Sequence, residues 1–152
     1  MAPTALSVDQ LRARVGSPLG FSEWHQVTQE EIDLFAKATG DYQWIHTDRE
    51  RARQGPFGTT IAHGYLTLSL ASALLAEVLA IEGPRFIVNY GLNRVRFPAP
   101  VPVGSRLRVG AVLESLEAVA GGGHQATLNC TFELEGSAKP ACVADVVFRY
   151  YG

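Results

Sequence analysis

An aspartate and a histidine stand five residues apart in a stretch that the sequence predicts to be a loop. Gly40 ends one helical pattern just before Asp41, and Asp48 begins the next helix just after His46. A carboxylate and an imidazole that converge on one water can share its deprotonation and the return of a proton, because histidine titrates near neutrality. An Asp and a His in one polar loop can also be a turn-forming residue and a surface residue. On spacing alone, both interpretations stay open.

A nearly uncharged segment lies downstream, and it predicts a helix with a functional N-terminus. From Gly64 to Ile81 the only formally charged residue is Glu77, and a helix that is apolar almost all round is expected to be buried. Its first N–H groups lack partners within the helix, so they can stabilise an oxyanion such as the enolate of a thioester. Gly64 has no side chain, which lets a ligand approach this backbone closely.

Several short elements are expected to position these residues. Ser7 caps a short helix that should pack on the outside of the protein. Thr28 and Glu31 have the spacing of a capping box, which begins a helix that Gly40 ends. Asp48 can cap a further short helix that runs to Gln54.

The second half of the chain predicts four strands. Alternating apolar residues cover residues 86–97, 106–114, 125–134 and 140–151. The phase slips near Gly91, which suggests a bulge, and three glycines from Gly121 make a turn. One buried helix followed by antiparallel strands indicates the α+β class, with the sheet curving round the helix.

Two cysteines fall on the last two predicted strands. If the turn between these strands is symmetric, Cys130 and Cys142 lie nearly opposite each other. A disulfide is one interpretation, and two reduced core residues are the preferred one, because the chain shows no export signal.

The composition indicates an ordinary globular protein. The 152 residues, 1–152, predict a single domain with residues 1–20 as an N-terminal helical extension. A net charge of −2 gives no electrostatic footprint for nucleic acid. The apolar run from Gly64 approaches membrane-spanning length, but Glu77 and the strand patterns after it argue against a membrane protein. Residues 1–14 lack the apolar region of a signal peptide, so the expected location is cytoplasmic.

Two motifs in this chain resemble those of a known family. Gly40-Asp41-x-Gln43-x-x-His46 is followed downstream by Ile61-Ala62-His63-Gly64 and an Ala/Leu/Ser-rich helix. This pattern resembles the hydratase motif of MaoC-like dehydratases and (R)-specific enoyl-CoA hydratases. The resemblance extends over residues 27–150 and includes Arg94 to Gly104. It implies a single hot-dog domain, in which a curved antiparallel sheet wraps round a long buried helix.

Gln43 and Trp44 depart from the usual form of this motif, which has Asn-Pro at the two positions. Gln43 keeps an amide but adds a methylene, and Trp44 replaces a rigid ring with a large aromatic one. The pair of Asp41 and His46 is intact, so the departure bears on substrate fit. A NodN-like subgroup of the same family shares the Gln-Trp form.

The resemblance implies reversible hydration of trans-2-enoyl thioesters to (R)-3-hydroxyacyl thioesters in fatty-acid metabolism. Asp41 and His46 would then hold and deprotonate the attacking water, and one of them would return the proton to C2. The Gly64 N–H would hold the thioester oxygen. This chemistry needs no metal or redox cofactor. The implied partners are an enoyl-CoA or acyl-carrier-protein thioester and a second copy of the chain in a homodimer joined at the sheet edges.

Further residues are candidates for the substrate site. Related hydratases tend to carry a site serine where this chain has Ser72, about two turns beyond Gly64, although a small packing residue would also fit there. Gln43, Trp44 and Tyr65 complete the candidate set, and the two aromatic residues have core packing as their alternative role. His63 is expected to be structural rather than a second base.

Two other functions stay open. Hot-dog proteins include acyl thioesterases, in which a carboxylate activates water to attack the thioester carbonyl, so the fold alone decides nothing. The second alternative is a non-catalytic acyl-binding protein, in which Trp44 closes the pocket. The spacing of Asp41 and His46 favours hydration.

Overall fold

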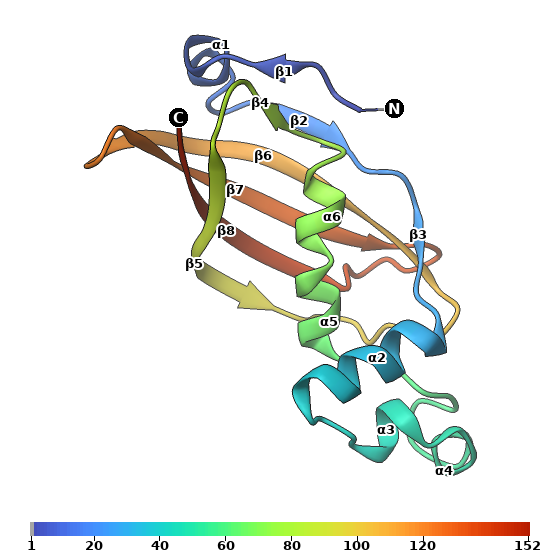
Figure 1. Cartoon of the computed structure of the whole chain (residues 1–152). Helices are drawn as coiled ribbons and strands as arrows, with labels where there is room; N and C mark the ends of the chain where they lie inside the picture. Colours follow the sequence, from blue (N-terminus) through green and yellow to red (C-terminus); the bar gives the residue numbers. More distant parts are fainter. Residues whose placement is uncertain (1) are drawn as a thin grey trace.

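A curved antiparallel sheet forms most of the protein in the computed structural model, which describes residues 2–152 (Figure 1). Its strand order is β2-β6-β7-β8-β5, and β3 also pairs with β6. The sheet strands are β2 (Pro18–Phe21), β3 (His25–Gln26), β5 (Phe86–Arg96), β6 (Arg106–Val119), β7 (Gly123–Leu134) and β8 (Cys142–Tyr151). Two short strands, β1 (Ala5–Leu6) and β4 (Ala80–Ile81), pair with each other in parallel.

Two short helices in line take the place of the expected long helix. They are α5 (Gly64–Ser69) and α6 (Ala71–Leu75), and they lie across one face of the sheet (Figure 1). Leu70 separates them, yet its N–H still donates to the carbonyls of Leu66 and Thr67 at 3.0 and 3.3 Å. The helical path therefore continues through the interruption with shortened hydrogen-bond spacing. The α+β layout with a curved sheet round a central helical segment is confirmed.

Only one face of this helical segment is buried in the single chain. The side chains that point toward the sheet, including Leu66, Ala71 and Leu74, belong to the core. Tyr65, by contrast, is 71% exposed. The expected burial of this helical segment is therefore confirmed on its sheet side, and its outer side is exposed in the single chain over residues 2–152.

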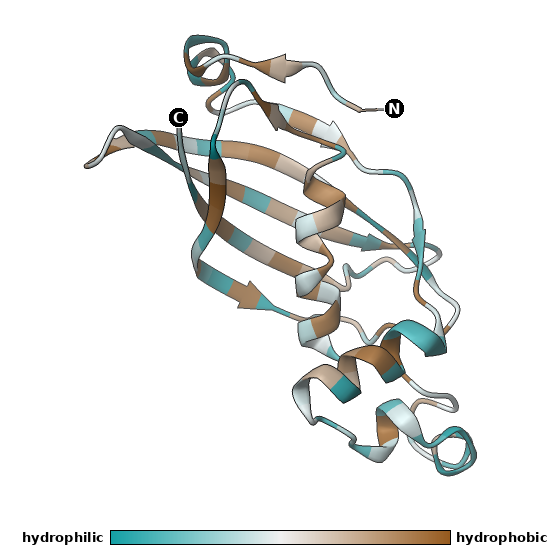
Figure 2. Cartoon of the chain, viewed as in Figure 1, coloured by the Kyte–Doolittle hydropathy of each residue, from teal (hydrophilic) through white to brown (hydrophobic). Residues whose placement is uncertain are grey.

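Strand β5 lies at the edge of the sheet and is also unusually apolar on its surface. It pairs with β8 alone. Figure 2 shows hydrophobic residues on β5 as well as on the inner strands. The exposed apolar side chains of this strand are Phe86, Ile87, Val88, Tyr90 and Leu92. An unpaired, apolar edge is a site at which another chain can add.

The predicted strand irregularity and turn are both present. The pairing of β5 with β8 shifts register between Asn89 and Gly91, and again between Leu92 and Val95, so the bulge expected near Gly91 is confirmed. The chain turns from β6 into β7 at Gly121 and Gly122, which have φ values of 84° and 77°. These are left-handed conformations that glycine adopts without steric cost.

The caps predicted for three helices are confirmed. Ser7 and Gln10 form a capping box at α1 (Val8–Ala13), and Thr28 and Glu31 form another at α2 (Gln29–Thr39). The carboxylate of Asp48 accepts the Arg51 N–H at the start of α4 (Arg49–Arg53). Each cap satisfies backbone donors that a helix cannot satisfy internally.

The N-terminal segment agrees with its prediction in one respect and differs from it in another. Helix α1 packs on the outside of the protein as expected, with Leu11 as its one buried residue among exposed and half-buried neighbours. The segment also contributes strand β2, which pairs with β6 and was not expected. Burial of the Leu11 side chain explains why the extension stays attached to the sheet.

The cysteines are both reduced core residues, but they are not opposite each other. In the β7–β8 pair, Cys130 faces Ala144 and Cys142 faces Phe132, so the two are offset by two positions. Both thiols are free and buried. Burial raises the pKa of Cys130 to about 12 and that of Cys142 to about 11, so both stay protonated at neutral pH.

Among residues 2–152, no helix has the length and apolar character needed to cross a membrane.

Candidate active site

Asp41 is presented by the turn that ends α2. Gly40 adopts a left-handed conformation, with φ of 80°, and its N–H bonds to Ala36 at the helix end. The chain then reverses, and the exposed carboxylate of Asp41 accepts the Gln43 N–H at 3.3 Å. This local bond holds the carboxylate at the start of the next short helix.

That next helix, α3 (Trp44–Thr47), carries His46 and replaces the predicted loop. His46 is 6% exposed, and its Nδ1–H donates to the carbonyl of Ile61 at 2.7 Å. A carbonyl can only accept, so this bond assigns the ring hydrogen to Nδ1 and leaves Nε2 with a free lone pair. His46 is thus oriented as a proton acceptor.

The backbone of His46 is fixed as firmly as its ring. Its carbonyl accepts a hydrogen bond from Gln29 Nε2 at 2.8 Å, and Gln29 is itself buried. Gln29 Oε1 accepts from the hydroxyl of Thr60 at 2.6 Å. The first residue of α2 therefore links the helix that carries His46 to the segment that holds its ring.

The segment of residues 60–62 forms the other wall of the site. The Ile61 N–H donates to Ile45 at 3.0 Å, and the Ala62 N–H donates to Val101 at 2.8 Å. Val103 donates back to Thr60 at 2.9 Å. The acceptor for the His46 ring is therefore anchored on both sides.

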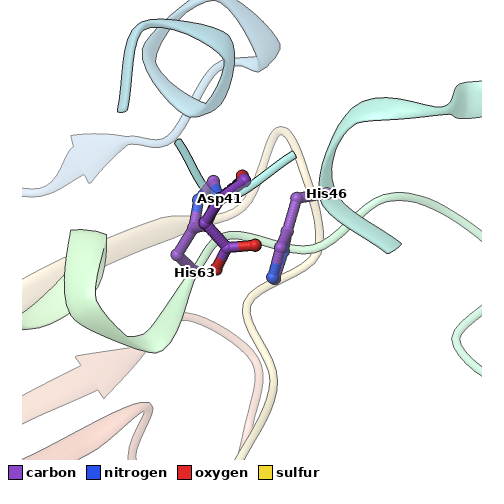
Figure 3. Close-up of side chains that lie close together, drawn as sticks. All are labelled: Asp41, His46 and His63. Atoms are coloured by element: carbon purple, nitrogen blue, oxygen red, sulfur yellow. Dashed lines mark hydrogen bonds between the residues drawn. The ribbon is translucent and has the colours of Figure 1, made fainter. Parts of the chain in front are cut away.

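His63 completes a compact cluster with the two predicted residues. It is 2% exposed, its Nε2–H donates to the backbone carbonyl of Asp41 at 3.0 Å, and its ring stacks on that of His46 at 3.9 Å. One carboxylate oxygen of Asp41 and one nitrogen of each histidine all lie within 4.8 Å of one another. Figure 3 shows the Asp41 carboxylate beside the His46 ring.

The surroundings keep His46 in its neutral form. Burial is the main cause that lowers its pKa below the ordinary value of 6.5. The hydrogen bond to Ile61 opposes this shift, the charge of His63 adds to it, and the charge of Asp41 opposes it. The net pKa of His46 is lowered, so at neutral pH its Nε2 is available as a base.

The same three side chains offer metal-ligating atoms, but their arrangement fits a water molecule better. The two imidazole rings are stacked with 25° between their planes. Two stacked rings this close to parallel have planes that do not meet near the rings, so their in-plane lone pairs cannot both point at one ion, as tetrahedral coordination requires. A water that bonds to two groups spans about 4.5 Å between them, and the atoms of this cluster all lie within 4.8 Å of one another, so one water has the right size to bridge them.

Gly64 follows directly, as the first residue of α5. A side chain at Gly64 would lie 3.2 Å from the ring of Phe97, so the space left by this glycine is used by a neighbour in the same chain. Its backbone N–H stands in the first turn, where helix donors lack internal acceptors.

Gln43 and Trp44 lie outside the cluster in the single chain. The Gln43 side chain is exposed, and only its backbone N–H reaches Asp41. Trp44 packs on α4: the guanidinium of Arg51 lies 4.4 Å from its ring centre, and a side chain at Gly55 would lie 2.8 Å from its ring. In the single chain, Trp44 therefore packs against the end of α4.

Ser72 and Tyr65 face the open side of the helical segment. Ser72 lines a groove of about 590 Å³ between α5–α6 and β5. The groove walls are mainly apolar and include Leu68, Leu75, Leu79, Ile87 and Leu92. Tyr65 contacts Phe97, with 6.3 Å between ring centres, and projects into solvent. Neither residue joins the cluster of Asp41, His46 and His63.

The geometry agrees with comparisons to known proteins. A family model described as MaoC like domain matches residues 10–131. This chain belongs to the MaoC-like dehydratase family. The match includes the whole cluster and the groove-lining helices.

Curated relatives cover nearly the full length of this MaoC-like chain. The 3-hydroxyacyl-thioester dehydratase Z of Mycobacterium tuberculosis is 56% identical over 144 residues, which is 95% of each chain. Nodulation protein N of Rhizobium leguminosarum is 45% identical over 142 residues, covering 92% of this chain and 88% of that protein. The second match confirms the NodN-like resemblance.

Solved structures confirm the MaoC-like fold. A monoamine oxidase regulatory protein from Archaeoglobus superposes with a TM-score of 0.78 at 21% identity, covering 100% of this chain and 99% of that chain. An (R)-hydratase from Pseudomonas aeruginosa superposes with a TM-score of 0.67 at 25% identity, covering 90% of this chain and 81% of that one.

Proposed function

We propose that this protein catalyses the reversible hydration of trans-2-enoyl thioesters to (R)-3-hydroxyacyl thioesters. The observation that carries the proposal is the cluster in which one carboxylate oxygen of Asp41 and one ring nitrogen each of His46 and His63 lie within 4.8 Å of one another, close enough for Asp41 and His46 to hold one water between them. The 56% identity to a protein named 3-hydroxyacyl-thioester dehydratase Z supports the same reaction. The relatives do not favour the thioesterase alternative.

The water is activated by two groups with different tasks. His46 is neutral and has its ring hydrogen on Nδ1, so Nε2 takes a proton as the water oxygen attacks C3. The Asp41 carboxylate accepts the other hydrogen of the water and sets its orientation. A positioned base of this kind accelerates a reaction by roughly 10²–10⁴-fold.

The negative charge that develops on the thioester oxygen needs a donor, and the Gly64 N–H at the start of α5 is our candidate. It follows His63 in the chain and so lies beside the cluster. One such donor contributes about 3 kcal/mol to stabilisation of the transition state. One of the two acid–base groups then returns the proton to C2, so that the elements of water are added and no co-reactant is consumed.

The acyl thioester and a second chain are the proposed partners. The apolar groove lined by Ser72 is suited to the acyl portion, and the carrier is coenzyme A or acyl carrier protein. The unpaired apolar edge at β5 supports a homodimer that joins two sheets. In that assembly Gln43, Trp44 and Tyr65 stay proposed substrate-site residues.

Two broader predictions accompany this function. Residues 1–152 act as one domain, since one cluster of buried apolar residues runs from Leu11 to Tyr150. The cytoplasmic location stays a prediction from the sequence.

The decisive experiment follows the enoyl absorbance of crotonyl-CoA and longer trans-2-enoyl-CoA substrates. Asp41→Asn and His46→Gln should each lower kcat by about 10²-fold or more, with the circular dichroism spectrum unchanged. Glu117→Gln, on the surface of β6, is the matched control and should keep full activity.

Product analysis separates the hydratase from the alternatives. A hydratase forms 3-hydroxyacyl thioester and releases no free thiol. Release of thiol would contradict the proposal in favour of a thioesterase. Binding of acyl-CoA without turnover on any chain length would favour a non-catalytic acyl-binding protein.

A further inference from the structure

His63 is buried within the candidate site but has no place in the proposed reaction. It is 2% exposed, and its Nε2–H is already donated to a backbone carbonyl. Yet it contacts both reacting residues: its Nε2–H bonds to the Asp41 carbonyl at 3.0 Å, and its ring stacks on His46 at 3.9 Å. No other side chain in residues 2–152 bonds to the Asp41 backbone and also stacks on His46.

We propose that His63 is a positioning residue that sets the distance between the Asp41 carboxylate and the His46 ring. The proposal rests on the function proposed above. Asp41 is exposed, and it bonds locally to Gln43 and Thr39. The hydrogen bond from His63 Nε2–H to the Asp41 carbonyl, here called the tether, connects it to the wall of the site. The same ring covers one face of His46, so a shift of His63 would change the position of Asp41 relative to the His46 ring.

The position of His63 in the chain explains how it can perform this task. It immediately precedes α5, and the N–H groups of Leu66 and Thr67 both bond to its carbonyl, at 3.0 and 3.2 Å. Its ring also contacts Phe35 of α2, with 4.9 Å between ring centres. The tether therefore runs from the central helical segment to the turn that ends α2, across 22 residues of sequence.

The electrostatics give a readout that simple packing would not affect. The titratable groups that act on His46 are Asp41 and His63. The other elements packed on it present a neutral Gln29 side chain and the Ile61 carbonyl. His63 lowers the pKa of His46, so its replacement by a neutral residue should raise that pKa and move the acid limb of kcat/KM to higher pH.

Two substitutions separate the tether from the ring. His63→Gln keeps an N–H donor at nearly the same reach and loses the ring, whereas His63→Phe keeps the ring and loses the donor. His63→Phe should lower kcat by about tenfold, because one hydrogen bond is lost, and should leave KM nearly unchanged. His63→Gln should recover most of kcat. Both should move the acid limb to higher pH.

Phe35→Leu is the packing control, since it loosens the contact with His63 without removing the donor. It should reduce stability and leave the acid limb in place. The proposal is overturned if His63→Phe keeps full kcat and an unmoved acid limb of kcat/KM. It is also overturned if His63→Phe and Phe35→Leu have the same kcat and the same acid limb. Loss of folding in both His63 variants would also overturn it, because His63 would then serve folding rather than alignment.

A titration of the His46 ring by NMR tests the inference without turnover. In the unmodified protein His46 should titrate below its ordinary pKa with its hydrogen on Nδ1. In His63→Gln the midpoint should rise. An unchanged midpoint contradicts the positioning role even if the hydratase reaction is confirmed, and a raised midpoint supports it even if the natural substrate is a different thioester.

Discussion

Two regions of this molecule differ in how many of their contacts are made within a single chain. The polar junction, residues 41–63, is held by hydrogen bonds within the chain, including the ring of His46 on Ile61 and its carbonyl on Gln29. The open face, formed by β5 and the outer sides of α5 and α6, exposes apolar side chains and an unpaired strand edge. The candidate reacting groups are thus ordered in a single chain, whereas the surface next to them leaves apolar side chains uncovered, which is why we propose that a second chain covers it.

The two regions use different kinds of interaction. Hydrogen bonds fix atoms with directional precision, and the polar junction uses them to assign a tautomer and a spacing. Apolar contacts stabilise without direction, and they are the contacts by which the proposed second chain and acyl group would bind the open face. Changes in the polar junction should therefore alter rate or stability, and changes in the open face should alter assembly.

The largest expected effect comes from a charge on the open face. Ile87 is 51% exposed and lines the groove on β5, so Ile87→Lys can be tolerated by one chain but would bury a charge between two. The dimer should dissociate about 100-fold more readily, as measured by sedimentation at micromolar concentration. Leu34→Lys, at an exposed position of α2, is the control and should remain dimeric. An unmodified protein that sediments as a monomer would contradict the proposal that the open face binds a second chain.

An effect of similar size in free energy is expected from the buried amide that links the two walls of the polar junction. Gln29→Leu leaves the His46 carbonyl and the Thr60 hydroxyl without their partners. The free energy of unfolding should fall by about 2–3 kcal/mol, measured by urea denaturation. Gln26→Leu, at an exposed glutamine of β3 with one hydrogen bond, should change it by less than about 0.5 kcal/mol. Equal effects at the two glutamines would show that Gln29 is not a link.

The smallest effect is a pH dependence of stability that arises from His46. Its pKa is lowered in the folded protein from 6.5, so below that value the unfolded chain binds more protons than the folded one. Stability is therefore complete above pH 6.5 and is lost as the pH falls toward the lowered value. The loss from this one group is at most about 1.4 kcal/mol per pH unit.

His46→Gln removes that group and should flatten the same pH profile. The free energy of unfolding of both proteins is compared between pH 7 and pH 5. Parallel profiles would mean that His46 does not titrate with a lowered pKa.

Local signals in the sequence were sufficient for most of the fold. Capping residues such as Thr28 and Asp48 act within one helical turn, and strand alternation acts within one strand, so both can be recognised without distant partners. Strand β2 was missed because Pro18 and Gly20 disrupt the pattern in a four-residue strand. Helix α3 was missed because four residues are too few to show a period.

The candidate site was partly predictable for a similar reason. Asp41 and His46 stand close in sequence and are close in space. The role of His63 depends on a bond to a residue 22 positions away, which no local pattern encodes. Trp44 and Tyr65 remain predictions for the substrate site: in the single chain Trp44 packs on Arg51 and Tyr65 is exposed, so neither position follows from the local sequence. The type of a residue indicates whether its side chain favours an apolar environment, but it does not identify the residues that the side chain contacts in the folded protein.

The bond between the His46 ring and Ile61 also sets an order of events during folding. Ile61 is held in place by neighbours that bond to Val101 and Val103, some of the most distant residues in sequence that serve the site. Helix α2 and its caps can form from local contacts alone, whereas closing this long loop is slow. On refolding, helical circular dichroism should therefore recover first, and hydration activity should appear only when the segment around residue 101 has joined. The orientation of the His46 base therefore depends on a contact between two segments that lie far apart in the sequence.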